Sequence, residues 1–190
     1  VAVLVTGDEI VESGQDLPPG KVRNVNGYSL TAIVVACGAE LSDYGIIRDR
    51  KEELGSALSE ATATTDIVFI SGGSSMGTRD LTMAAIEALP DSEVIFHGIA
   101  IAPGKPTILA RAGSTAIMGL PGNPAAAAVV LALFGQVLVR GIGGEDIAHL
   151  LATRPRVRAR LAANLPAIEG RDHYARVRLA ENGPALEAWP

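Results

Sequence analysis

The fold is decided by residues 66–77, Asp66-Ile67-Val68-Phe69-Ile70-Ser71-Gly72-Gly73-Ser74-Ser75-Met76-Gly77, where an apolar run passes directly into glycines and serines. A short continuous apolar run bounded by polar residues is typical of a strand that is buried on both faces of a parallel sheet. The glycines and serines that follow indicate a tight loop. Asp80 is expected to open the next helix, which ends near Leu89.

The same order of strand, glycine-containing loop and helix is expected elsewhere in the chain. The apolar run Val1 to Val5 ends in Thr6-Gly7-Asp8-Glu9, and the run Thr115 to Gly119 ends in Leu120-Pro121-Gly122-Asn123-Pro124. Further strands are expected at about 40–47, 93–101 and 107–110, and helices at 27–37, 51–64 and 124–140. Asn26 is read as the N-cap of the first helix and Gly38 as the residue that ends it. This alternation predicts a three-layer α/β/α domain with a mostly parallel mixed sheet.

The α/β domain is expected to cover residues 1–145, and residues 146–190 to form part of a small β domain. Residues 156–161 and 174–179 alternate basic and apolar side chains, which is the period of a strand. About 40 residues can hardly bury a core of their own. The chain also begins inside a strand, so we expect it to be a piece of a longer protein.

Composition excludes several classes of function. The formal net charge is −5, which argues against a nucleic-acid surface. We expect no apolar stretch to reach the ~18 residues of a membrane span, and 125–139 is interpreted as a buried helix. No signal peptide is expected. The single cysteine, Cys37, excludes an internal disulfide and is read as a buried thiol. The three histidines have no zinc-like spacing.

Three loops should meet at one edge of the sheet, because each follows the carboxyl end of a strand: Thr6 to Glu9, Ser71 to Ser75, and Leu120 to Pro124. Ligands of open α/β sheets bind at this edge, and glycines there bring backbone N–H groups close to an anion. For any one such loop taken alone, ordinary turn chemistry is the favoured explanation. Neither a Walker P-loop nor a GxGxxG motif is present. The three loops together predict a crevice for a phosphorylated ligand.

Acidic side chains accompany these loops. Asp8, Glu9, Asp49 and Asp80 follow predicted strands or begin the next helices, and carboxylates beside phosphates can hold Mg²⁺. Helix capping is an alternative role for Asp49 and Asp80, whereas no helix is expected next to Glu9. Lys105, at the turn Pro103-Gly104-Lys105-Pro106, is interpreted either as an anion ligand or as a solvated surface lysine.

The order of these motifs resembles the MoeA/gephyrin E-domain family of molybdopterin molybdotransferases. The resemblance rests on the ordered stretches 6–9, 20–26, 45–49, 71–77 with Asp80, 103–106 and 119–124, and more loosely on 170–179. It implies a cytoplasmic homodimer that hydrolyses adenylylated molybdopterin and inserts molybdate into the dithiolene with the help of Mg²⁺.

The resemblance also implies a role for each matching residue. Asp80 and Glu9 would lie at the metal and the phosphate, and Asp49 would be a further functional acid. The ligand would contact the following positions: Thr6, Gly7, Asp8, Gly72, Gly73, Ser74, Ser75, Lys105, Pro121, Gly122, Asn123 and Pro124.

The sequence departs from the family at two positions. Ala102 stands where many members have lysine, and His97 where many have a basic residue, which leaves tungstate open as the oxyanion. The family's N-terminal domains lie outside this sequence, so a fragment that binds ligand without turnover is expected. Two alternatives are a pterin- or nucleotide-binding module without chemistry and another enzyme of this fold, such as a molybdopterin adenylyltransferase or a CinA-like hydrolase. The Leu120 to Pro124 loop and the β tail argue against the second.

Overall fold

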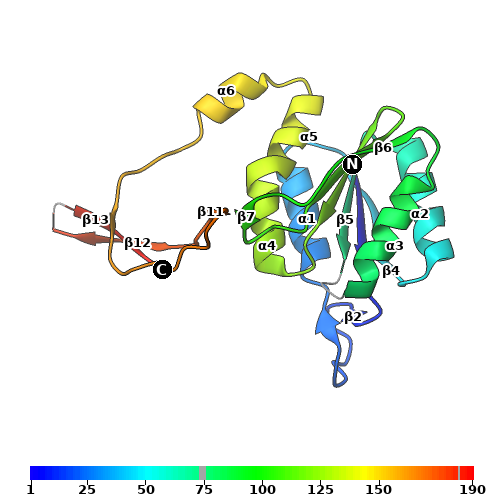
Figure 1. The fold of residues 1–190 in the computed structure, drawn as a ribbon, viewed down its shortest axis with the longest axis horizontal. Helices are drawn as coiled ribbons and strands as arrows, with labels where there is room; N and C mark the ends of the chain where they lie inside the picture. Colours follow the sequence, from blue (N-terminus) through cyan, green and yellow to red (C-terminus); the bar gives the residue numbers. More distant parts are fainter. Residues whose placement is uncertain (73–75, 184) are drawn as a thin grey trace.

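A computed structural model describes the backbone of residues 1–72, 76–183 and 185–190 (Figure 1). Side chains are described for the same residues except 76–80. The predicted ligand-binding residues Gly73, Ser74 and Ser75, and the side chain of Asp80, therefore lie outside the described residues.

A six-stranded mixed sheet forms the centre of the molecule. Its strands lie in the order β4 (Ser42–Ile47), β1 (Ala2–Thr6), β5 (Ile67–Gly72), β9 (Thr115–Leu120), β8 (Ile108–Ala112) and β6 (Ser92–His97). The first four strands are parallel, whereas β8 and β6 run antiparallel to their neighbours. The predicted mostly parallel sheet and the hairpin of β8 with β9 are confirmed.

Helices cover both faces of this sheet (Figure 1). One layer holds α2 (Lys51–Thr64) and α3 (Met76–Glu87). The other holds α1 (Asn26–Ala36) and a continuous helix made of α4 (Pro124–Val130), a π-helical turn η1 (Leu131–Gly135) and α5 (Gln136–Ile142). The three-layer α/β/α architecture is confirmed.

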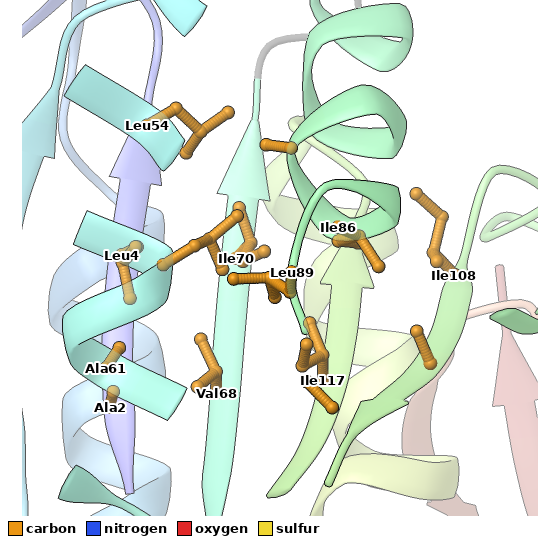
Figure 2. Close-up of a cluster of buried hydrophobic side chains, with 14 residues drawn as sticks. Ala2, Leu4, Leu54, Ala61, Val68, Ile70, Ile86, Leu89, Ile108 and Ile117 are labelled. Carbon is orange, nitrogen blue, oxygen red and sulfur yellow. The ribbon is translucent and has the colours of Figure 1, made fainter. Parts of the chain in front are cut away.

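Two hydrophobic cores, one on each face, explain why the central strands are continuously apolar. Leu4 of β1 and Val68 of β5 pack with Leu54 of α2 on one face, together with Ile86 of α3 (Figure 2). The neighbouring residues along the strands point the other way, so Phe69 packs on the opposite face with Leu30, Val34, Val130 and Leu131. Alternate residues thus serve opposite layers, and no polar face is left.

Two expectations about helix starts are wrong. The α3 helix begins at Met76, so Asp80 lies inside it and does not open it. The N-cap of α1 is Val25, and Asn26 is a helical residue whose side chain bonds elsewhere. Gly38 does end α1 as predicted, with φ of 79°.

The expectation that no apolar stretch reaches membrane length is also wrong. The helix Pro124–Ile142 is 19 residues long, and by length and composition alone it could cross a membrane. Its inner residues pack in the core of the domain: Ala126, Ala127, Val130, Leu131, Gly135 and Val139. Its burial against the sheet supports the interpretation as a core helix.

The C-terminal residues leave this core (Figure 1). After an unpredicted helix α6 (Ile147–Ala152), the strands β10 (Arg160–Leu161), β12 (Arg178–Asn182) and β13 (Ala185–Trp189) form a separate sheet. These strands are shorter than, or shifted from, those predicted at 156–161 and 174–179. Among residues 155–183 and 185–190, only Glu187 is buried. Two short strand pairs complete the structure, β11 (Asp172–His173) with β7 (Ile101–Ala102), and β2 (Ile10–Val11) with β3 (Val22–Arg23).

Candidate functional site

The candidate site lies where the order of the parallel strands reverses. From β1 the chain passes through α1 to β4 on one side, and then through α2 to β5 on the other side of β1. A reversal of this kind opens a crevice beyond the carboxyl ends of the strands. The described loops after β1 and β9, and Gly72 at the end of β5, lie at this edge, as the sequence predicted.

A cavity of about 410 Å³ occupies this crevice. Five of the residues predicted for the site line it, namely Glu9, Gly72, Gly122, Asn123 and Pro124. The remaining lining residues were not among the predicted ligand contacts, although Ser71 begins one of the predicted loops: Val5, Ile10, Val22, Arg23, Asn24, Val25, Asn26 and Ser71. Residues of the loops after β1 and β9, the end of β5 and the segment 22–26 therefore line one cavity.

The wall formed by the loop after β9 is also the start of a helix. Asn123 caps α4, because its Oδ1 accepts hydrogen bonds from the N–H groups of Ala125 at 3.0 Å and Ala126 at 3.2 Å. Pro124 occupies the first helical position, where it has no N–H to leave unpaired. A helix N-terminus at a cavity wall attracts negative charge.

There is little space for a side chain on the wall at the end of β5. A Cβ on Gly72 would lie 3.0 Å from Cγ2 of Thr6. Thr6 is itself buried at the end of β1, so it has little room to move. The close approach of the two strand ends explains why a residue without a side chain follows Ser71.

The side chain of Asn26 does not cap a helix, contrary to the prediction, but bonds to two distant segments. Its side-chain amide is buried and donates to Oγ of Ser71 at 2.6 Å and to the carbonyl of Gly122 at 2.9 Å. These partners are 45 and 96 residues away in the sequence. The only local signal was an asparagine amid apolar residues, which fits a helix cap equally well.

The acids after β1 and β4 form a hydrogen-bonded cluster beside the cavity. The buried hydroxyl of Thr6 donates to Oδ1 of Asp49 at 2.6 Å, and the N–H of Asp49 donates to Oδ1 of Asp8 at 3.3 Å. Lys21 donates to the carbonyl of Asp8 at 2.7 Å. The N-cap of α2 is Arg50, without a side-chain bond, so capping by Asp49 is excluded. Gly7 is buried next to this cluster.

Lys105 lies at the same edge of the sheet but away from the cavity. Its turn leads into Ile108, which pairs with Gly119 near the end of β9. The Lys105 side chain is exposed and is absent from the cavity lining, and His97 is also exposed. Pro121, by contrast, is buried, and its carbonyl lies 3.5 Å from the Asn26 amide.

A preformed metal centre is not present among the side chains that the structure describes. No three of their histidine, cysteine, aspartate and glutamate side chains are grouped closely enough to hold an ion. Cys37 is half-buried rather than fully buried, and burial raises the pKa of its thiol. A thiol that resists ionisation is a poor nucleophile, in agreement with its interpretation as a packing residue.

Comparison with known proteins identifies the family. Residues 2–140 match the model of the "Probable molybdopterin binding domain". The chain belongs to this family. The match covers all of the sheet and both helical layers, and it ends within α5.

Members of the family that resemble this chain have related names. It is 38% identical over 147 residues to the molybdopterin molybdenumtransferase of Nostoc sp., covering 76% of this chain and 34% of that protein. It is 40% identical to the structure of a molybdopterin biosynthesis MoeA protein from Pyrococcus horikoshii, with a TM-score of 0.66 over 76% of this chain and 36% of that one.

A second Pyrococcus horikoshii MoeA structure is 20% identical, with a TM-score of 0.68, and covers 98% of this chain and 42% of that one. At that identity the likeness concerns the fold alone. The chain spans about a third of the length of the curated relatives that it matches.

Proposed function

We propose that this domain binds adenylylated molybdopterin in the crevice and serves a molybdopterin molybdotransferase, which inserts molybdate into the dithiolene and releases AMP. The observation that carries the proposal is the 410 Å³ cavity at the strand reversal of a molybdopterin-binding domain. Glu9, Gly72 and Gly122 to Pro124 all face it. The proposal concerns the complete protein, because this chain spans about a third of the length of the curated relatives that it matches.

The cavity combines features that suit a phosphorylated pterin. The start of α4 supports negative charge at one wall. Val5, Ile10 and Val22 supply apolar surface for a flat ring. Arg23 lines the cavity, and its Nη1 donates to the carbonyls of Glu12 and Gln15, so the side chain is a positioned cation. Gly73, Ser74, Ser75 and Lys105 are proposed to complete the contacts with the ligand.

Mg²⁺ is part of the proposal as an aid to phosphate chemistry. The described acids supply only oxygen donors, which is the ligand type that Mg²⁺ prefers, and Mg²⁺ usually needs one or two carboxylates besides phosphate and water. We assign Glu9, on the cavity wall, and Asp80 as its ligands. When bound, the ion would neutralise charge on the phosphates. Thr6 and Asp8 hold Asp49 beside the cavity, where its carboxylate is proposed to orient the ligand.

The test is molybdate-dependent AMP release by the full-length protein. Asp80→Asn and Glu9→Gln are each expected to lower release at least 100-fold, because each removes a charged ligand of the ion. Asp91→Asn, on an exposed turn after α3, is the control and is expected to retain wild-type release. Undiminished release in Asp80→Asn would refute its role.

Calorimetry separates the transferase from a binding module. The full-length protein is loaded with adenylylated molybdopterin and titrated with molybdate and then tungstate. Binding of the pterin with no AMP release under either oxyanion would identify a module without chemistry. Ala102 and the exposed Lys105 make this second function a specific alternative, since neither places a cation among the residues that line the cavity.

We further propose that the full-length protein is a cytoplasmic homodimer with a cleft shared between subunits. Sedimentation of the full-length protein tests the dimer. A monomer that retains full AMP release would contradict the shared cleft.

A further inference from the structure

A buried side-chain amide connects two walls of the crevice that are far apart in the sequence. Asn26, in the first turn of α1, is 8% exposed. Its Nδ2 donates to Oγ of Ser71, near the end of strand β5, and to the carbonyl of Gly122, in the loop between β9 and α4. Both amide hydrogens are therefore used, one on each wall.

These bonds determine the orientation of backbone groups at the rim. In a trans peptide unit the C=O and the following N–H point in opposite directions. The carbonyls of Pro121 and Gly122 face Asn26 at 3.5 and 2.9 Å. The N–H groups of Gly122 and Asn123 consequently point away from Asn26, and this direction depends on its amide.

We propose that Asn26 is a positioning residue that holds the end of β5 and the loop Pro121–Asn123 in the arrangement that receives the phosphorylated ligand. The ligand part of this inference rests on the proposed function, whereas the ordering of the loop does not. Asn26 acts through Ser71 and Gly122 and has no role in the chemical step.

Asn24 provides a matched control because it is equally buried, at 7% exposed, and comes from the same segment. Its amide bonds only locally, donating to Oε1 of Glu12 at 3.1 Å, and its Oδ1 accepts from the N–H of Gly27 at 2.9 Å. Loss of Asn24 should loosen residues 12–27 without releasing the loop after β9.

The test measures amide hydrogen exchange in the ligand-free chain and affinity for adenylylated molybdopterin in the full-length protein. Asn26→Ala is expected to raise exchange about tenfold at residues 125–127, whose N–H groups donate to Asn123, in line with the loss of hydrogen bonds worth ~1 kcal/mol each. It is also expected to weaken ligand affinity about tenfold. Asn24→Ala is expected to leave exchange at residues 125–127 unchanged.

Asn26→Asp adds a pH readout. The ionised carboxylate has no hydrogen to donate and repels the carbonyl oxygen of Gly122, although the Ser71 hydroxyl can donate to it, whereas the protonated form can donate one bond to Gly122. The difference in exchange at residues 125–127 between this variant and the wild type should therefore shrink as the pH is lowered. If Asn26→Ala does not fold, Ser71→Ala replaces it, since this variant removes one acceptor only.

Equal exchange at residues 125–127 in the Asn26 and Asn24 variants, or unchanged exchange there in Asn26→Ala, would overturn the inference. Wild-type protein that does not bind adenylylated molybdopterin would refute the proposed function instead, and exchange would still decide the role of Asn26.

Discussion

Replacing Gly104 by alanine is expected to destabilise the domain through two separate effects. Gly104 lies in the Pro103–Pro106 turn with φ of 123°, a conformation that costs an alanine about 1–3 kcal/mol. The added Cβ would also lie 2.6 Å from Cδ1 of Ile101 and 2.8 Å from Cγ2 of Val130, so these core side chains must move. Overpacking of this kind costs a further ~1–3 kcal/mol.

The expected total is therefore about 2–6 kcal/mol, measured as the free energy of unfolding in urea. Gly113→Ala is the matched control, because φ is 56° and no atom lies within 4 Å of the added Cβ. It should cost only the backbone term of ~1–2 kcal/mol. If Gly104→Ala is no more destabilising than Gly113→Ala, the crowding argument is wrong. A second readout is the affinity for adenylylated molybdopterin, which should fall if the turn positions Lys105.

Two further predictions concern hydrogen bonds to carboxylates. Thr6→Val keeps the volume of a buried side chain but removes the bond to Asp49. The free energy of unfolding in urea should therefore fall by about 1–2 kcal/mol. Thr6→Ser keeps the hydroxyl and should retain most of this stability. The bond from Arg140 lowers the pKa of the Glu145 carboxyl from its ordinary value of 4.5. The ion pair thus stabilises the end of α5 above pH 4.5 and loses this effect as the pH falls through the lowered pKa. Thermal melts of wild type and Glu145→Gln should accordingly differ at pH 7 and converge at pH 2; an equal difference at both pH values would exclude the pair as the cause.

Secondary structure and topology class could be predicted from sequence because they depend on local patterns. The period of Leu54, Leu58 and Ala61 predicted the α2 helix over 51–64, and the continuous apolar runs at 1–5 and 66–71 predicted strands covered on both faces. Glycine-containing loops after these strands predicted a crevice at one edge, because the carboxyl ends of parallel strands coincide. The ordered motifs named the family that the comparisons confirm.

The partners of the polar side chains were decided only by tertiary structure. Asn26 and Asp49 each had a local explanation as a helix cap, yet Asn26 bonds to Ser71 and Gly122, and Asp49 to Thr6. A cap is satisfied within three residues, whereas these bonds close only when strands and helices from distant parts of the chain pack together. Local sequence therefore determined where this protein could hold a ligand, and the packing of the sheet determined which residues form the walls.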